Sequence, residues 1–197
     1  EIACLLAMAA ARHNDKVGLV LFSDQVEGFV PPRRGRTHML RLVREVLSCQ
    51  PKRRGTDVSH ALDFINKVTK RRAVVFAISD FQGMGEPAQL LVTLRRSLHM
   101  VKRRHDLVAI CVHDPRERSL PDLGLITIED AETGEMVELD SGAARVRDCF
   151  AEQARQQREG LQRLLRRESI DHTEIDTSVP YLPALIEFFL KRKRSRR

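Results

Sequence analysis

The chain has 197 residues, with 34 Lys and Arg against 27 Asp and Glu, which gives a net charge of +7. This length suits one α/β domain with a sizeable core, and no Ser/Gly/Pro-rich linker divides it. No apolar run approaches the length of a membrane span, and no signal peptide with a cleavage site is visible, so we expect a soluble, cytoplasmic protein. The basic balance permits contact with phosphates, an anionic membrane surface or an acidic protein.

The first part of the chain predicts two helices on either side of a strand pair, followed by a third helix. Residues 1–15 are rich in Ala and Leu and predict a helix. KVGLVLF (16–22) predicts a buried strand, and VEGFVPP (26–32) a shorter strand that its two prolines should end. A helix is predicted over RTHMLRLVREVLSC (36–49), and another after Gly55-Thr56-Asp57, where apolar residues recur at the 3.6 period.

The second part alternates strands and helices, apart from one predicted hairpin. The predicted elements are a strand over 73–80, a helix carrying Leu90, Leu91, Leu94, Leu98 and Val101, a strand over 106–112, a hairpin over 123–140 with its turn at 132–135, a long helix over 143–168, a strand over 171–177 and a helix over 180–190. Near-continuous apolar strands alternating with helices predict a mostly parallel sheet with helices on both faces.

Basic residues gather in short clusters and in a tail. We divide the chain into one domain, residues 1–190, and a basic tail, residues 191–197, which should be dispensable for folding. Most clusters lie where a predicted element begins or ends, which favours solvated loop ends over a nucleic-acid site. One Tyr and no Trp leave few rings on which bases could stack, so nucleic acid is an unlikely partner. Four cysteines without a C-x-x-C pair are interpreted as buried free thiols.

Three predicted strands end in a carboxylate, at Asp24, Asp80 and Asp114. In an open parallel sheet the ligand crevice lies outside the carboxyl ends of the strands, and the loop with Thr56 and Asp57 should lie beside them. Hydroxyl and carboxylate oxygens suit a hard cation such as Mg²⁺ or Mn²⁺. Structural roles are an equal alternative, because Asp57 is well placed as an N-cap and Asp80 could order the turn after its strand. We assign no role to His113 or to the other histidines.

Five ordered blocks of the sequence together resemble one bacterial family. The blocks are NDKVGLVLFSDQVEGFVPPRRGRTHMLRLVRE, RGTDVSHAL, RRAVVFAISDF, RRHDLVAICVHDPRERSLPDLGLITIEDAETGE and YLPALIEFFLKRKR. The chain resembles the family known as domain of unknown function fifty-eight, whose members carry a von Willebrand factor A-like domain. This resemblance implies a Rossmann-like α/β fold and, as partners, a MoxR-type AAA+ ATPase and a client protein.

The resemblance also implies a metal ion-dependent adhesion site (MIDAS). Such a site takes an Asp-x-Ser-x-Ser motif from its first loop, a Thr from the second and an Asp from the third, and Thr56 and Asp80 match the last two. The chain contains no Asp-x-Ser-x-Ser motif. We therefore expect the first, central strand to be absent from this chain, so that KVGLVLF and AVVFAISD lack a neighbour between them. We also expect that residues 1–197 alone do not retain Mg²⁺ or Mn²⁺.

Three functional hypotheses follow. The preferred one is a metal-dependent protein–protein interaction module without enzymatic activity, acting with a MoxR-type AAA+ ATPase in the assembly or maturation of other proteins. The second is a Mg²⁺-dependent phosphotransfer or nuclease domain, which is disfavoured because a Thr occupies the second loop and no D-x-D pair precedes a helix. The third is a nucleic-acid binder that uses the basic clusters.

Overall fold

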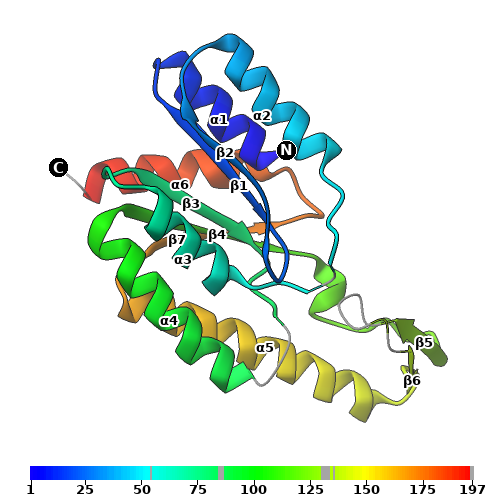
Figure 1. Cartoon of the computed structure of the whole chain (residues 1–197). Coiled ribbons are helices and arrows are strands. Elements are labelled where there is room, and N and C mark those ends of the chain that lie inside the picture. The colour runs from blue at the N-terminus through cyan, green and yellow to red at the C-terminus, as the bar shows by residue number, and fades with distance from the viewer. Residues whose placement is uncertain (54, 84–86, 130–133, 135, 196–197) are drawn as a thin grey trace.

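A computed structural model describes residues 1–53, 55–83, 87–129, 134 and 136–195 (Figure 1). Its elements, in chain order, are α1 (Ile2–Arg12), β1 (Val17–Phe22), β2 (Val26–Arg33), α2 (Arg36–Ser48), α3 (Val58–Val68), β3 (Val74–Ser79), α4 (Pro87–Arg104), β4 (Asp106–His113), the short 3₁₀ helix η1 (Pro115–Glu117), β5 (Leu125–Glu129), β6 (Met136–Asp140), α5 (Ala144–Arg167), β7 (Asp171–Asp176) and α6 (Tyr181–Ser195). No helix in these ranges is long and apolar enough to cross a membrane.

The core is built around a parallel sheet in the order β3–β4–β7. Side chains alternate between the two faces of a strand, and in the central strand β4 both sets are buried. Leu107, Ala109 and Cys111 pack on the side of α3, α4 and α5, whereas Val108 and Ile110 pack on the side of α1 and α6. The predicted α/β class, with helices on both faces of the sheet, is confirmed.

Strands β1 and β2 form a separate antiparallel sheet. Among the described residues β1 does not pair with β3, as expected if the position between them holds no strand. Helix α3 connects the two sheets, because Val58 and Leu62 lie in the main core while Phe64 packs edge-to-face on Phe29 of β2. Figure 1 shows β1 and β2 running beside α1 and α2, apart from the central sheet.

Strand β2 ends one residue after its two prolines. It runs from Val26 to Arg33, close to the predicted range of 26–32, and includes Pro31 and Pro32. Proline is tolerated in a strand whose N–H groups need no ladder partner, and in the described part of the chain β2 pairs only with β1. The bulge-like register shift between Val17 and Leu19 of β1, opposite this segment, further relaxes the pairing.

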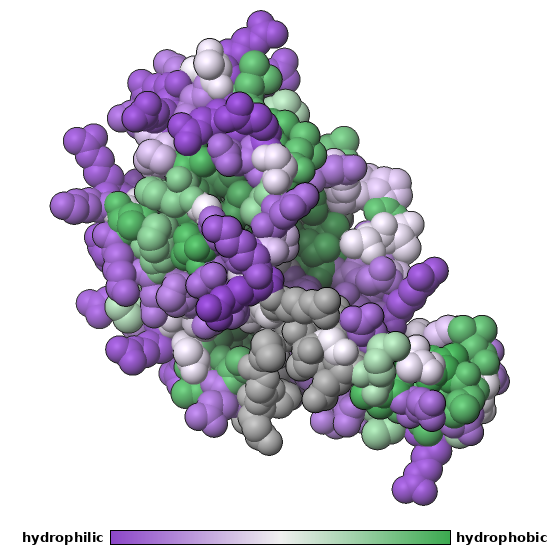
Figure 2. Space-filling view, turned by 45° about the vertical axis from the view of Figure 1, so that its right-hand side comes forward, coloured by the Kyte–Doolittle hydropathy of each residue, from purple (hydrophilic) through white to green (hydrophobic). Residues whose placement is uncertain are grey.

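The hairpin β5–β6 projects from the body and exposes apolar side chains. Its strands pair from Leu125 opposite Asp140 to Glu129 opposite Met136, as predicted, and the predicted turn at 132–135 falls largely outside the described residues. Figure 2 shows the hairpin as a lobe at the lower right on which apolar side chains gather. Leu123, Leu125, Met136 and Val137 are exposed there.

The long helix α5 is continuous, as predicted for residues 143–168. Gly160 does not break it, and a Cβ at this position would lie 3.2 Å from Leu91 Cδ1 on α4. The glycine therefore allows α4 and α5 to approach closely.

Cys4, Cys49, Cys111 and Cys149 are free thiols, as expected, but only Cys111 is buried and Cys149 is exposed. The prediction that all four are buried was wrong.

Glu168, the C-cap of α5, holds α4 and α5 together. Its carboxylate accepts hydrogen bonds from Arg95 Nε (2.9 Å) and bonds with His99 Nδ1 (3.0 Å), and its carbonyl oxygen accepts one from Lys102 Nζ. The hydrogen bonds from Arg95 and His99 lower the pKa of the Glu168 carboxyl below its ordinary value.

This lowered pKa predicts an acid-sensitive contribution to stability. A carboxyl group with a lower pKa in the folded state stabilises the fold above its ordinary pKa of about 4.3, and the contribution is lost as the pH falls through the lowered value. We expect Glu168→Gln to lower the melting temperature at pH 7, with the difference from wild type shrinking below about pH 4. The exposed Glu187→Gln on α6 is the control. A difference that stays constant down to the lowest pH would contradict this assignment.

Candidate functional site

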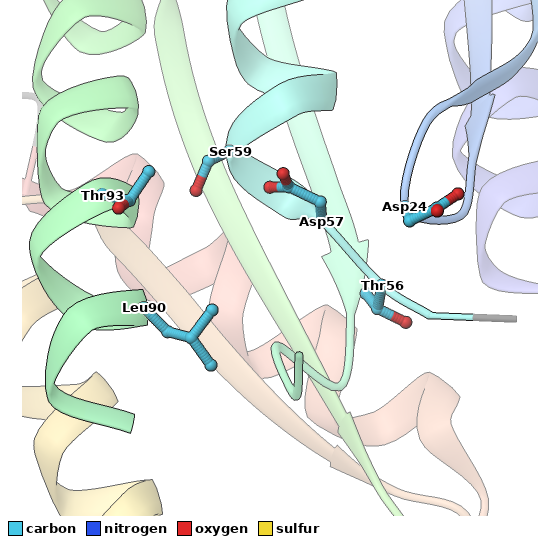
Figure 3. A pocket seen from close by; sticks show the side chains of 6 residues that line it. All are labelled: Asp24, Thr56, Asp57, Ser59, Leu90 and Thr93. Atoms are coloured by element: carbon cyan, nitrogen blue, oxygen red, sulfur yellow. The ribbon is translucent and has the colours of Figure 1, made fainter. Parts of the chain in front are cut away.

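A hollow of about 280 Å³ lies where three segments meet that are far apart in sequence (Figure 3). Asp24 comes from the turn between β1 and β2, Thr56, Asp57 and Ser59 from the start of α3, and Leu90 and Thr93 from α4. Figure 3 shows the Asp57 carboxylate and the Ser59 hydroxyl on the side of α4, whereas the Thr56 hydroxyl points the other way, toward the side of Asp24. Of the predicted group of Asp24, Asp80, Asp114, Thr56 and Asp57, the structure brings Asp24, Thr56 and Asp57 to this hollow.

Asp57 has the structural role that its sequence context suggested. It is the N-cap of α3, and its Oδ1 accepts a hydrogen bond from the backbone N–H of His60 (2.9 Å). Its own backbone N–H donates to the carbonyl oxygen of Ser23 (2.8 Å), at the end of β1. Asp57 thus fixes the start of α3 against the first sheet and positions the neighbouring Thr56.

Asp24 lies in a polar network at the end of β1. The hydroxyl of Ser23 donates to Glu27 Oε1 (2.7 Å) and reaches Asp24 Oδ1 (3.3 Å). Arg53 Nη1 lies 3.5 Å from Asp24 Oδ2. This ion pair is largely exposed and long, and such pairs contribute roughly 0–1 kcal/mol, so the Asp24 carboxylate remains open to another ligand at little cost.

Asp80 orders the turn after β3 and does not line the hollow. Its Oδ1 accepts hydrogen bonds from the backbone N–H of Gln82 (3.1 Å) and the hydroxyl of Ser79 (3.2 Å). The same loop returns to Thr56, since a Cβ on Gly83 would lie only 2.9 Å from the Thr56 carbonyl oxygen. Backbone contact thus brings the Asp80 loop against the Thr56 loop. The Asp80 side chain orders its turn, which the sequence analysis gave as one of its two alternative roles.

The third strand-end carboxylate, Asp114, caps η1 and does not reach the hollow. Its Oδ1 accepts from the backbone N–H of Arg116 (2.9 Å), and Glu117 completes a capping box. Gln82 Nε2 donates to Glu117 Oε2 (3.0 Å), which connects the loops after β3 and β4. Burial raises the pKa of Glu117 above its ordinary value, and the nearby charges of Asp80 and Asp114 raise it further, against a backbone hydrogen bond at Asp114.

His113 is a buried residue at the end of β4. Its Nε2 lies 3.8 Å from Glu174 Oε2, beyond hydrogen-bonding distance. Glu174 is instead held by the side chains of Arg158 and Gln162 on α5. Burial lowers the pKa of His113 below its ordinary value, partly offset by the Glu174 carboxylate.

The metal ligands that the sequence predicts are Thr56 and Asp80. No group of three or more His, Cys, Asp or Glu side chains in the described ranges is placed to hold a metal ion. Mg²⁺ prefers six oxygen ligands in near-ideal octahedral geometry, several of them waters. Thr56 and Asp80 can offer one hydroxyl and one carboxylate, so the remaining ligands would have to come from elsewhere. Their assignment as metal ligands stays a prediction.

Ser59, Leu90 and Thr93 also line the hollow, although the sequence predicted no site role for them. Ser59 lies in the first turn of α3, two residues after Asp57. Leu90 and Thr93 are three residues apart on α4, a spacing that places them on one face of the helix. In the sequence Leu90 was predicted only as an apolar residue of this helix.

Comparison with known proteins places this α/β domain in a family. Residues 1–160 match the family described as "Protein of unknown function DUF58". An uncharacterized protein of Mycobacterium avium is 30% identical over 167 residues, which cover 84% of this chain and 94% of that protein. Uncharacterized proteins of Mycobacterium tuberculosis and Mycobacterium bovis are 29% identical over 183 residues, and the match spans 92% of this chain but only 55% of their length. The chain belongs to the DUF58 family, as its sequence blocks predicted.

Two solved structures also resemble the chain. One is an aerotolerance-related membrane protein from Bacteroides fragilis, with a TM-score of 0.49 and 14% identity, covering 89% of this chain and 80% of that one. The other is the conserved hypothetical protein BatB from Bacteroides thetaiotaomicron, with a TM-score of 0.47 and 12% identity, covering 99% of this chain and 89% of that one.

Proposed function

We propose that the hollow around Thr56 is a protein-interaction site and that the domain binds partners without catalysing a reaction. The supporting observation is that Asp24, Thr56 and Asp57 converge in one open hollow from segments that are distant in sequence. A shallow hollow with hydroxyl and carboxylate oxygens on one side and Leu90 on the other suits a protruding side chain of a partner.

We further propose that a divalent ion, Mg²⁺ or Mn²⁺, takes part in this recognition through Thr56 and Asp80. The support is the family resemblance and the backbone contact that brings the two loops together. A hard cation with few carboxylate ligands supplies an electrophilic position that a carboxylate of a partner can occupy. Asp80 already accepts two hydrogen bonds within its turn, which would pre-orient the carboxylate.

The proposed partner is a MoxR-type AAA+ ATPase, and the process is assembly or maturation of a client protein. This part of the proposal rests on the resemblance alone.

Two features favour a binding role over hydrolysis. The second loop carries Thr56 where a carboxylate ligand would be needed, and the carboxylates of Asp57 and Asp114 are used as helix caps. A hydrolytic metal site would need such carboxylates as direct ligands.

The proposal is tested with the natural full-length protein and the MoxR-type ATPase of the same organism. Binding is measured by calorimetry with Mg²⁺ and with EDTA, for wild type, Thr56→Val and Thr127→Val. Both substitutions remove a hydroxyl at constant size, but Thr127 is exposed on β5 of the hairpin and does not line the hollow. We expect Mg²⁺-dependent binding to be lost in Thr56→Val and kept in Thr127→Val. Binding that is equal in EDTA, or equally affected by both variants, would contradict the proposal.

A further inference from the structure

Helix α6 exposes a second apolar stripe in addition to the one that it buries. Leu185 is buried against the central sheet, and Tyr181, Phe188 and Phe189 pack beside it. Outside this buried face lies an "α6 ridge" of four half-exposed aliphatic side chains: Val179 (57% exposed) in the turn before the helix, and Leu182 (48%), Ile186 (51%) and Leu190 (54%) on it. The four-residue spacing of the last three places them on one side of the helix. Packing onto the sheet does not account for this outer stripe.

Exposed cations lie at the carboxyl end of the α6 ridge. Lys191, Lys193 and Arg194 are exposed on α6, whereas Arg192 turns inward to an ion pair with Asp106. The sequence adds Arg196 and Arg197, and within Tyr181–Ser195 the acidic residue is Glu187. Cations are stabilised at the carboxyl end of any helix, because the helix dipole is negative there. This effect extends over only the last turn, and it does not explain why an exposed apolar stripe lies next to the cations. Lys193 and Arg194 follow Leu190 at spacings of three and four residues, so they continue the side of the helix that carries the ridge, and Lys191 lies beside them.

The charge of the chain is divided unevenly, so the part outside residues 119–144, which includes α6, is more basic than the net charge suggests. Residues 119–144, which include the hairpin β5–β6, contain seven acidic and no basic residues. The other residues therefore carry 34 basic against 20 acidic side chains. An anionic surface would attract α6 and repel the hairpin, so the charges also favour one orientation of the molecule on such a surface.

We propose that the α6 ridge binds the surface of an anionic lipid bilayer. In this arrangement Leu182, Ile186 and Leu190 enter the boundary between headgroups and acyl chains, while Lys191, Lys193 and Arg194 contact lipid phosphates. Amphipathic helices bind membranes in this way, and clusters of four to eight Lys and Arg are attracted to acidic lipids. The helix lies along the bilayer surface and does not cross it.

The chemistry of the ridge favours lipid over other anionic partners. Single-stranded nucleic acids stack their bases on aromatic rings, whereas the four exposed apolar side chains of the ridge are aliphatic. Peptides that bind helical surfaces use a groove between elements, whereas the α6 ridge is the convex face of one helix. A bilayer presents phosphates and hydrocarbon together over a flat area, which matches cations beside aliphatic side chains on a convex surface.

The test is vesicle flotation of the natural full-length protein. Vesicles contain phosphatidylcholine alone or mixed with phosphatidylglycerol, at low and at high salt. The charge variant combines Lys191→Gln, Lys193→Gln and Arg194→Gln, and its matched control combines Arg163→Gln, Arg166→Gln and Arg167→Gln. The control residues are exposed on α5, which packs on the other face of the sheet. A third protein with Ile186→Gln and Leu190→Gln tests the apolar part. Circular dichroism confirms that each variant is folded.

We expect binding to the phosphatidylglycerol vesicles that weakens with salt. Each Lys or Arg near an anionic membrane contributes about five-fold in affinity, so the charge variant should bind on the order of a hundred-fold more weakly. The α5 control should bind nearly as well as wild type, and the apolar variant should lose binding even at low salt. Absence of vesicle binding at low salt, or equal losses in the charge variant and the α5 control, would overturn the proposal. So would ridge-dependent binding of DNA without vesicle binding.

Discussion

Replacing Arg192 by alanine is expected to lower the free energy of unfolding by about 3 kcal/mol. Its guanidinium group joins α6 to the starts of two sheet strands, through Asp106 Oδ1 of β4 (2.5 Å) and Asp171 Oδ2 of β7 (2.7 Å). The side chains of Arg192 and Asp106 are only 11% and 14% exposed. Removing one partner of a buried ion pair leaves the other charge poorly solvated, which is the main source of the loss.

Urea unfolding of the natural full-length protein measures this effect, and Arg194→Ala is the matched control. Arg194 is an exposed Arg two positions along the same helix, so its replacement should change stability by less than about 0.5 kcal/mol. Equal midpoints for the two variants would show that the Arg192 ion pairs are unimportant. The expected difference also bears on the domain boundary, because the predicted division at residue 190 falls inside α6 and Arg192 is anchored within the fold.

Residues 1–197 produced on their own are expected to unfold without a single cooperative transition and to associate. Strands β1 and β3 are each paired on one side only among the described residues. Each buried backbone group without a partner costs roughly 1–3 kcal/mol, against a total stability of about 5–15 kcal/mol. Helix α1 has an apolar sequence but no fully buried residue, so it too lacks full cover.

Hydrogen exchange at single-residue resolution tests this expectation. Amides of β3 that do not face β4 should exchange much faster than those of Val108, Ala109 and Ile110 in β4, which are paired on both sides and fully buried. The internal control is the set of β3 amides that are hydrogen-bonded to β4, which should be protected from exchange. Uniform protection along β3, together with a monomeric and cooperatively unfolding chain, would contradict the expectation.

Much of the fold was predictable because its strands and helices have strong periodic patterns. The runs 16–22, 73–80 and 106–112 became β1, β3 and β4, and the long helix and the hairpin appeared where expected. The extent of β2 was also predicted to within one residue, because two consecutive prolines are tolerated only near the end or edge of a strand. The buried Arg192, in contrast, was missed. Its spacing from Leu185 and Phe188 is helical and inward, but a run of cations suggested a solvated tail.

The candidate site was predictable in part. The rule that ligands lie beyond the carboxyl ends of strands brought Asp24, Thr56 and Asp57 together correctly. The same rule did not predict that Asp80 and Asp114 lie outside this hollow, with carboxylates that accept local turn and cap hydrogen bonds. Short polar side chains at strand ends often make such local bonds, and these depend on backbone geometry that the sequence does not reveal.

Titration of Mn²⁺ into the natural full-length protein, followed by electron paramagnetic resonance of the free ion, tests whether Thr56 and Asp80 bind a divalent ion. Wild type, Thr56→Val, Asp80→Asn and the control Thr127→Val, an exposed position on β5, are compared, with folding checked by circular dichroism. We expect saturable binding of one ion that Mg²⁺ displaces, strong weakening in Thr56→Val and Asp80→Asn, and unchanged binding in Thr127→Val. Wild-type affinity in Thr56→Val and Asp80→Asn, or no saturable binding in the wild type, would contradict the proposed metal site.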